Sequence, residues 1–256
     1  MSKSRYVTGL RAVEQLIGSS KAEIRKLYAE YQSANPRVTA VIAQANARGI
    51  EIQSANRARL QQISGESRHQ GVVAEIARSL VLDEAALRSL VEQHLTDDAA
   101  APLLLLLLDG LQDPHNLGAC LRTADAAGVH AVAAPRHGAA GLGPAVSKVA
   151  AGAAENLPFA TVGNIGRVMD WLTGYGVTCV GTSDAAGQSV YDCDLSGPVA
   201  LVMGREHEGL RKNVAGRCAA LVSLPMLGTV SSLNVSVATG ICLFEALRQR
   251  RAGSDS

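Results

Sequence analysis

The sequence contains no apolar run long enough to cross a membrane. The longest such run, Ala99 to Leu108, is far shorter than the ~18 to 20 residues that span a bilayer. The first residues, Met1 to Leu10, lack the apolar stretch of a signal peptide. These absences exclude secretion and membrane insertion as first interpretations, and we expect a soluble, cytoplasmic protein.

The sequence also lacks the spacings that hold metals or disulfides. Its five cysteines are an odd number and include no CxxC pair, and its six histidines form no HExxH. Neither a disulfide framework nor a zinc site is predicted, and a reducing compartment fits this cysteine usage. We therefore expect a protein without a metal ion.

Composition indicates an ordinary globular protein. Of the 256 residues, 47% are hydrophobic and 18% are charged, and the 25 Gly and 8 Pro are too few for a fibrous or disordered chain. This length suits one large or two small domains. No period of 20 to 50 residues recurs, so a solenoid is not expected.

The net charge of +1 is distributed unevenly along the chain. Residues 1–78 contain 12 Lys and Arg against 6 Asp and Glu, residues 79–101 contain 1 against 5, and residues 102–256 contain 11 against 12. A basic module beside a near-neutral one is typical of an enzyme with a separate domain that holds nucleic acid, because clustered cations attract phosphates. Ordinary surface solubility is the alternative explanation.

The pattern of apolar residues divides the chain into two modules. Helix-like and strand-like stretches alternate over residues 1–79 and predict a small α/β domain. Residues 80–101 form an acidic linker in which apolar side chains recur at helical spacing, so a short amphipathic helix is expected there. These apolar positions are Leu82, Ala86, Leu87, Leu90 and Val91.

The second module, residues 102–256, alternates strands and helices. Six consecutive leucines, Leu103 to Leu108, end at Asp109-Gly110, too early for a helix, and predict a buried strand. Further strands are predicted at 129–134, 159–162, 177–181, 199–203 and 221–224, and helices at 117–127, 144–154, 165–173, 208–217 and 233–250. Strands joined by helical crossovers predict a parallel sheet that helices cover on both faces.

In such a sheet ligands bind beyond the carboxyl ends of the strands. The loop from Asp109 to Gly118, DGLQDPHNLG, has no GxGxxG, which removes the main support for a nicotinamide-dependent dehydrogenase. The loop ends in Asn116, a good helix N-cap residue, and Arg122 follows on the predicted helix. A cap and a surface arginine are the simpler interpretation of these two residues.

Two later loops also contain polar groups. The loop from Met203 to Gly209 places Glu206 between two glycines. The loop from Leu224 to Asn234 gathers hydroxyl and amide side chains before a long helix, where free N–H groups favour an anion. These side chains are Ser231, Ser232 and Asn234. Helix capping alone needs only one of them.

At these three loops the sequence resembles the SpoU branch of the SPOUT superfamily, S-adenosylmethionine-dependent RNA 2′-O-ribose methyltransferases. The resemblance rests on DPHNLGACLR at 113–122, LVMGREHEG at 201–209 and LPMLGTVSSLNVSVATGICLFE at 224–245. It extends to YVTGLRAVEQLI and HQGVVAEI in the first module. Arg205 and His207 depart from the pattern, because small residues are expected at both positions.

The resemblance implies an architecture that periodicity alone does not predict. The second module is expected to be an α/β domain with a deep trefoil knot that binds the methyl donor, although general topology rules advise against knots. The first module is expected to resemble ribosomal protein L30e and to bind the RNA substrate. The resemblance also implies a homodimer with the knots at its interface.

The resemblance further implies roles for individual residues. Arg122 would contact an RNA phosphate and help activate the hydroxyl, and Asn116 would position the ribose or Arg122. Glu206 would hold Arg122 or the neighbouring chain, while Ser232 and Asn234 would orient the target nucleotide. The donor would be held mostly by backbone atoms of Thr182, Met203, Gly204, Leu224, Met226, Ser231 and Leu233.

The nearest branch of the family implies a guanosine in the peptidyl-transferase region of 23S rRNA as substrate. The same chemistry on tRNA or on another rRNA site remains an alternative. A catalytically idle RNA-binding or ribosome-assembly protein is the alternative from a different class. No catalytic histidine is evident, so catalysis is expected to depend on orientation and electrostatics, with a phosphate oxygen or water as a candidate proton acceptor.

Overall fold

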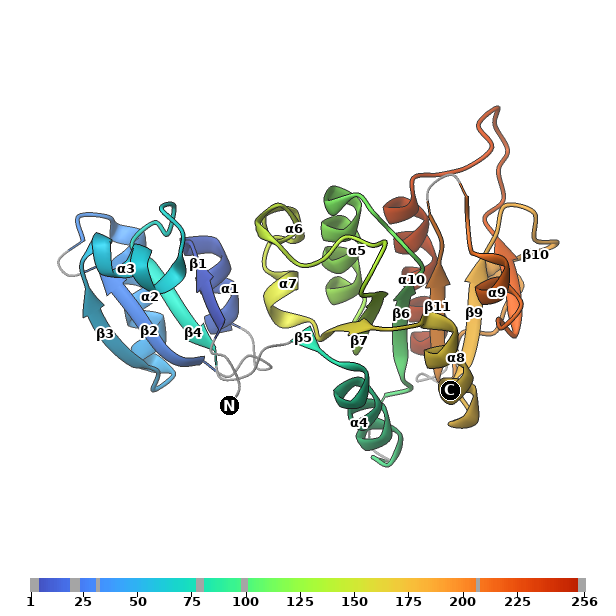
Figure 1. The fold of residues 1–256 in the computed structure, drawn as a ribbon, viewed down its shortest axis with the longest axis horizontal. Helices are drawn as coiled ribbons and strands as arrows, with labels where there is room; N and C mark the ends of the chain where they lie inside the picture. The colour runs from blue at the N-terminus through green and yellow to red at the C-terminus, as the bar shows by residue number, and fades with distance from the viewer. Residues whose placement is uncertain are drawn as a thin grey trace. The chain divides into compact units, whose positions relative to one another are not determined.

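The computed structural model of the chain describes residues 5–18, 24–30, 33–76, 81–97, 101–205 and 208–252. The chain divides into two compact units. The small unit comprises Met1–Leu80 with Ala151–Asn156, and the large unit comprises Val81–Ala150 with Leu157–Ser256. Figure 1 shows the elements of each unit, which are described separately below.

The small unit is built around a mixed sheet with the strand order β1-β4-β2-β3. Its elements between residues 5 and 76 are β1 (Arg5–Thr8), α1 (Leu10–Gly18), β2 (Ile24–Glu30), α2 (Pro36–Ala47), β3 (Glu51–Ala55), α3 (Arg57–Ser64) and β4 (Val72–Ile76). Strands β2 and β3 are parallel, whereas β4 runs antiparallel to both of its neighbours. A small α/β module was predicted here, and the structure contains one.

Side-chain alternation along β4 explains how helices cover both faces of this sheet. Val72, Ala74 and Ile76 pack into one apolar cluster with residues of α1 and α2, whereas Val73 packs on the opposite face against Leu60 of α3. Helix α3 was not predicted, because Leu60 is its one buried residue and only Ile63 adds a second large apolar side chain, which is too few to define a helical period.

The large unit contains an eight-stranded sheet in which every pair of neighbouring strands is parallel. Its strands are β5 (Val81–Leu82), β6 (Leu104–Leu108), β7 (Ala131–Pro135), β8 (Phe159–Val162), β9 (Thr178–Thr182), β10 (Gln188–Ser189), β11 (Val199–Met203) and β12 (Ala220–Ser223). Their order is β10-β12-β9-β11-β6-β7-β8-β5. The predicted parallel sheet is confirmed, and β6 is the fully buried leucine strand expected at its centre.

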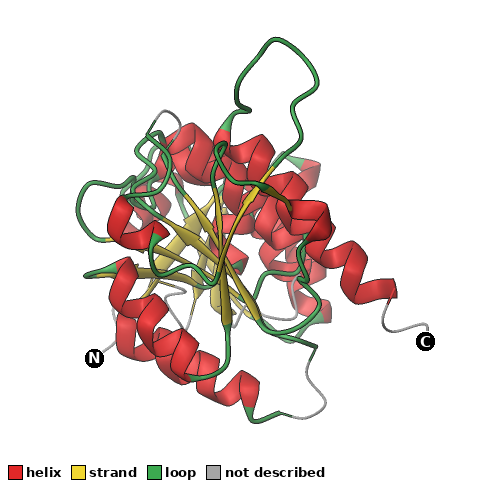
Figure 2. Cartoon of the chain, turned by 90° about the vertical axis from the view of Figure 1, so that its right-hand side faces the viewer, coloured by secondary structure: helices red, strands yellow, loops and turns green. Residues whose placement is uncertain are grey.

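Helices lie on both sides of this sheet (Figure 2). The helices of the large unit are α4 (Glu84–Leu95), α5 (Pro114–Ala126), α6 (Pro144–Ala150), α8 (Ile165–Gly174), the 3-10 turn η1 (Val190–Asp192), α9 (Lys212–Ala215) and α10 (Val235–Ala252). The short helix α7 (Ala153–Asn156) belongs to the small unit. Helices α4, α8 and α9 share one apolar cluster with alternate residues of the strands. Helix α10 packs against α5 and β11.

Two predicted helices are shorter in the structure than the sequence indicated. The helix expected at 144–154 is interrupted by Ala151 at φ 52° and Gly152 at φ 99°, so it forms α6 and α7 instead. The helix expected at 208–217 is reduced to α9, and Arg211 takes an extended conformation just before it. The segment expected as a linker, 80–101, supplies β5 and α4 to the large unit.

None of the described helices combines the length and apolar character that a membrane crossing requires. Within the described ranges, no group of three or more His, Cys, Asp or Glu side chains could hold a metal ion. All five cysteines are free thiols.

Candidate functional site

A hollow of about 310 Å³ lies where β12, β9 and β11 end. These three strands are neighbours and run in the same direction, so the segments that follow them meet at one edge of the sheet. The residues that line the hollow and were predicted as donor contacts are Thr182, Met203, Gly204, Leu224, Met226 and Leu233. Ser232 lines it as well.

The loop after β11 forms a tight wall of this hollow. Arg205 and Gly209 exchange two backbone hydrogen bonds, at 3.0 and 3.1 Å, which close the loop on itself. Gly204 packs so closely on this turn that a Cβ atom there would lie 2.2 Å from the carbonyl carbon of Gly209. No other residue type fits that space without a shift of the backbone.

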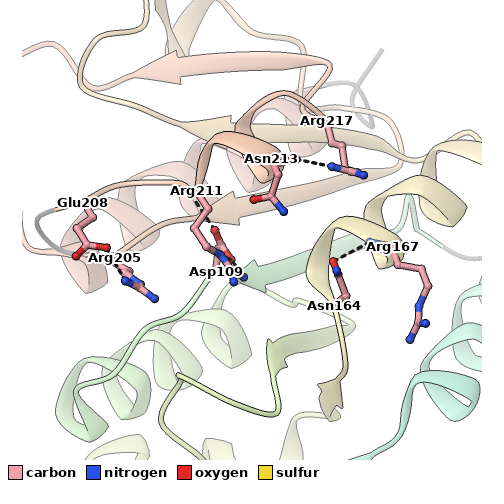
Figure 3. Close-up of polar contacts among 8 residues, drawn as sticks. All are labelled: Asp109, Asn164, Arg167, Arg205, Glu208, Arg211, Asn213 and Arg217. Atoms are coloured by element: carbon pink, nitrogen blue, oxygen red, sulfur yellow. Dashed lines mark hydrogen bonds and ion pairs between the residues drawn. The ribbon is translucent and has the colours of Figure 1, made fainter.

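A buried ion pair connects this region to the central strand. Asp109, the residue after β6, is fully buried and accepts hydrogen bonds from both the backbone and the side chain of Arg211 (Figure 3). The backbone N–H of Arg211 is 3.1 Å from Oδ2, and its Nε is 2.8 Å from Oδ1. The carboxylate raises the pKa of the Arg211 guanidinium by hydrogen bonding. Sequence reasoning missed this pair, although Asp109 directly follows the leucine strand.

Arg205, which departs from the family pattern, fits between two loops. Its side chain forms an ion pair with Glu208 (Figure 3). Its Nε lies against Gly110. A Cβ atom placed on Gly110 would be only 2.9 Å from this nitrogen. Gly110 has a φ of 87° and no side chain, so the loop after β6 leaves room for the guanidinium. The larger residue at 205 is therefore accommodated, whereas His207 lies outside the described residues.

The structure brings Asn116 and Asn234 together across 118 positions of sequence. The Nδ2 of Asn234 donates a hydrogen bond of 3.1 Å to the Oδ1 of Asn116. Asn116 is not the N-cap of α5, as had been predicted, because Asp113 takes that place by accepting from the backbone N–H of His115 at 2.8 Å. The Asn116 side chain instead joins α5 to the start of α10.

Asn234 itself performs the capping that was considered for its region. Its Oδ1 accepts from the backbone N–H and the hydroxyl of Ser236, at 2.9 and 2.6 Å. The hydroxyls of Ser231 and Ser232 are thus not needed to cap α10. Ser232 lines the hollow, whereas Ser231 is exposed and is not among the lining residues.

Three predicted catalytic residues, Arg122, Asn116 and Asn234, are not among the residues that line the hollow. Arg122 is exposed on α5 and is not among the lining residues. Glu206 lies outside the described residues, so its contacts are not assigned. Residues that line the hollow without having been predicted include Ser183, Asp184 and Glu208. Their position directly after β9 and β11 is the sequence feature from which they could have been predicted.

The arrangement suits a small molecule with an apolar body and a few polar groups. Met203, Leu224 and Leu233 offer apolar surface, and the strand ends offer backbone donors and acceptors. Thr182 and Met203 also contact each other, since the Thr182 hydroxyl lies 3.7 Å from the sulfur of Met203.

Two family models match the chain. The model described as the SpoU rRNA Methylase family matches residues 103–244. The model described as RNA 2′-O ribose methyltransferase substrate binding matches residues 6–80. Together the two matches cover both units.

Relatives resemble the chain over its whole length. The 23S rRNA (guanosine-2′-O-)-methyltransferase RlmB of Ralstonia nicotianae is 47% identical over 253 residues, which are 98% of each protein. The protein of the same name from Coxiella burnetii is 44% identical over 256 residues, which are 100% of each.

Solved structures with similar folds include two with a bound ligand. The SpoU methyltransferase AviRb of Streptomyces viridochromogenes in complex with AdoMet matches with a TM-score of 0.72 and 25% identity, over 98% of this chain and 92% of the other. An AdoMet-bound rRNA methyltransferase of Sinorhizobium meliloti matches with a TM-score of 0.69 and 29% identity, over 96% of this chain and 87% of the other.

Proposed function

Because the chain belongs to the SpoU rRNA methylase family, we propose that it transfers a methyl group from S-adenosylmethionine to the ribose 2′-hydroxyl of a guanosine in 23S rRNA. The relatives' names give the chemistry and the RNA, and the peptidyl-transferase region is the part of that RNA that we propose as substrate. We place this reaction in the cytoplasm.

One observation carries this proposal. The six predicted donor contacts that line the hollow come from three loops far apart in sequence, and the sheet gathers them at one edge. The hollow's apolar walls and strand-end backbone groups fit the adenosine part of S-adenosylmethionine, and its volume is that of a small-molecule site. Ser231 stays a proposed contact, through its backbone.

The chemistry requires a weak nucleophile to be oriented and polarised. When bound, S-adenosylmethionine supplies an electrophilic methyl group on a sulfonium. Arg122 would hold the phosphate beside the target ribose, since an arginine stays protonated and acts through its charge. Asn116 and Asn234, joined by their hydrogen bond, would position the ribose together with Ser232, and Glu206 would hold Arg122. The hydroxyl proton would leave to a phosphate oxygen or to water.

The architecture around this site is also part of the proposal. We propose that residues 1–79 hold the RNA, and that 102–256 form a knotted domain in which the segment after β11 passes through a loop of the chain. The strand order supports this path, because the chain leaves β11, forms β12 beyond β9, and returns as α10 beside β11.

A homodimer through this domain is proposed as well. The exposed apolar side chains Val237 and Phe244 support it, because they lie seven positions apart on α10 and therefore on one face of the helix. Val237 is 51% exposed and Phe244 is 48% exposed, so this face of α10 offers apolar surface that a second copy would cover. Sedimentation of the purified chain tests this association directly.

The test of the proposed activity is transfer of labelled methyl from S-adenosylmethionine to two unmodified transcripts, the peptidyl-transferase domain of 23S rRNA and a bulk tRNA. Mass spectrometry then locates the methylated ribose. Label on one guanosine of the rRNA alone is the expected result. Label on tRNA alone would keep the chemistry and overturn the substrate. Label on neither, with no donor binding in a titration, would favour an RNA-binding protein without catalysis.

A further inference from the structure

A second hollow, of about 790 Å³, lies within the small unit. It is bordered by the end of β2, the starts of α2 and α3, and the loop before β4. We propose that this hollow binds one unstacked nucleotide of the RNA substrate, with its phosphate at Arg57 and Arg68 and its base at Glu30 and His69. This inference rests on the proposed function, and it assigns the site at which the small unit binds the RNA.

The loop before β4 is held in a fixed shape. The side chain of Gln70 accepts a hydrogen bond of 3.0 Å from the backbone N–H of Leu10, and Gln70 has a φ of 53°, which few residues other than glycine adopt. Gly71 follows at a φ of 85°, and its carbonyl accepts from the backbone N–H of Glu30 at 2.8 Å. One wall of the hollow is therefore formed before any ligand arrives.

His69 supplies a hydrogen-bond donor in this wall. Its side chain is among those that line the hollow, and the residue is only 5% exposed. Its Nδ1 accepts a hydrogen bond of 3.1 Å from the backbone N–H of Gly71. Nε2 is then the nitrogen that carries the proton, and it has no hydrogen-bond partner within the described ranges. Its proton is therefore available to an acceptor that enters the hollow.

Glu30 and Arg57 place an acceptor and a cation side by side. The Nε of Arg57 donates to Oε1 of Glu30 at 2.8 Å, so the two terminal nitrogens of Arg57 remain available to a phosphate. The Arg57 side chain is 79% exposed, whereas that of Glu30 is 22% exposed. Arg68, also exposed, adds a second cation at the rim. The ligand that fits needs an anionic group and an edge with both a donor and an acceptor.

A nucleotide of single-stranded RNA meets each of these requirements. Its phosphate pairs with arginine, and every base offers donors and acceptors on its edge once it is unstacked. The volume of the hollow lies in the range that small-molecule sites occupy. The excess of 12 Lys and Arg over 6 Asp and Glu in residues 1–78 attracts the same polyanion to this unit.

Helix α3 provides a matched control for this site. Arg59 lies two positions after Arg57, on a different face of the helix, and its side chain donates to Gln62. Arg59 is not among the residues that line the hollow. His69→Asn retains an acceptor for Gly71 N–H and removes the donor at Nε2. Arg57→Gln removes the charge, and Arg59→Gln removes the same charge outside the hollow.

The experiment is a fluorescence-anisotropy titration of the full chain and the three variants with a labelled transcript of the peptidyl-transferase domain of 23S rRNA. Arg57→Gln and His69→Asn should each weaken binding about tenfold. Arg57→Gln should also lower the slope of log affinity against log salt by about one, while His69→Asn leaves that slope unchanged. Arg59→Gln should change affinity less than twofold.

Several outcomes overturn the inference. Equal losses of RNA affinity for Arg57→Gln and Arg59→Gln would show that only the overall charge of the unit matters. An unchanged RNA affinity in His69→Asn would show that His69 does not contact a base. Failure of the unaltered chain to bind the transcript would overturn it too. The far-ultraviolet circular dichroism spectrum and urea midpoint of each variant are the controls for folding. If the unaltered chain binds the transcript but transfers no methyl group, the proposed function fails while the affinity comparison still decides the inference.

Discussion

Gly204 is the residue whose substitution should change the hollow at the strand ends most directly. A Cβ atom at this position would lie 2.2 Å from the carbonyl carbon of Gly209 and 2.4 Å from the backbone nitrogen of Leu210. Backbone atoms of a closed turn cannot move aside, so Gly204→Ala should displace the wall of the hollow. We expect a loss of S-adenosylmethionine affinity of about a hundredfold or more, measured by isothermal titration calorimetry.

Gly174→Ala is the control for that substitution. Gly174 ends α8, and nothing lies within 4 Å of a Cβ atom placed there. This variant should bind the donor as the unaltered chain does. Wild-type donor affinity in Gly204→Ala would show that the hollow is not the donor site.

Substitution of Arg122 should affect catalysis without affecting binding of the methyl donor. It is exposed on α5 and is not among the residues that line the hollow, so Arg122→Ala should leave donor affinity unchanged. If its charge stabilises the transition state through the phosphate, kcat should fall about 100-fold to 1000-fold in methyl transfer to the rRNA transcript. Arg136→Ala, another exposed arginine of the large unit, is the comparison. Equal losses of donor affinity and turnover would assign Arg122 a structural role.

At this scale the sequence predicted residue types better than it predicted partners. The polar residues after the strands were recognisable from their position in the chain. The hydrogen bond between Asn116 and Asn234 was not, because it joins residues 118 positions apart. For the same reason Asn116 was assigned as a cap, although Asp113 performs that role. Local patterns carry no information on tertiary partners.

The pair between Asp109 and Arg211 joins the end of β6 to the segment before α9 through a fully buried carboxylate. Arg211→Ala would leave the fully buried carboxylate of Asp109 without its cation and should lower the free energy of unfolding by about 3 kcal/mol. The contrasting pair is Arg217 with Asp170, whose side chains are 41% and 57% exposed. Arg217→Ala should cost less than about 1 kcal/mol. Urea denaturation of both variants measures the difference, and equal losses would contradict this ranking.

Helices α5 and α6 are packed closely enough to exclude a single methyl group. A Cβ atom at Gly118 would lie 2.7 Å from Cβ of Val149 and 2.9 Å from the carbonyl oxygen of Val146. Gly118→Ala should therefore destabilise the fold by about 1–3 kcal/mol, although alanine favours helices. The measurement is a urea midpoint. A gain in stability would show that α6 can move away at no cost.

Element types followed from periodicity, while several element limits did not. The leucine strand β6 was predicted because Asp109-Gly110 ends the apolar run too early for a helix, and the long helix α10 was predicted at 233–250. The break at Ala151 and Gly152 depends on two positive φ angles, and alanine gives no sequence signal for such a conformation. Strand β10 has two residues, too few for any alternation to be visible.

For the whole molecule, buried thiols should make stability fall at alkaline pH. Burial raises the pKa of Cys179 to about 11 and those of Cys218 and Cys242 to about 12. In the unfolded chain a thiol ionises near pH 8.5. Above that pH the unfolded state loses protons that the folded state keeps, so the free energy of unfolding should decrease as pH rises. Urea titrations between pH 8 and pH 11 measure this decrease.

Cys218→Ala tests the assignment of that pH dependence. It removes one of the raised thiols, so the decrease between pH 9 and pH 11 should be shallower than in the unaltered chain. Identical slopes would mean that other groups, such as tyrosines and lysines, account for the alkaline loss.

The order of strands in the large sheet has a consequence for how quickly the chain reaches its native state. Strand β6, at the centre, pairs with β11, whose residues follow about 95 positions later, since Leu104 lies opposite Val199. The ends of so long a segment must meet before the central ladder gains any free energy. Folding should accordingly be slow for a chain of this size, and during synthesis the leucine strand, which can already pair with β7, must wait for β11 to leave the ribosome. An enzyme proposed to modify ribosomes would itself depend on a ribosome while one edge of an apolar strand is still unpaired.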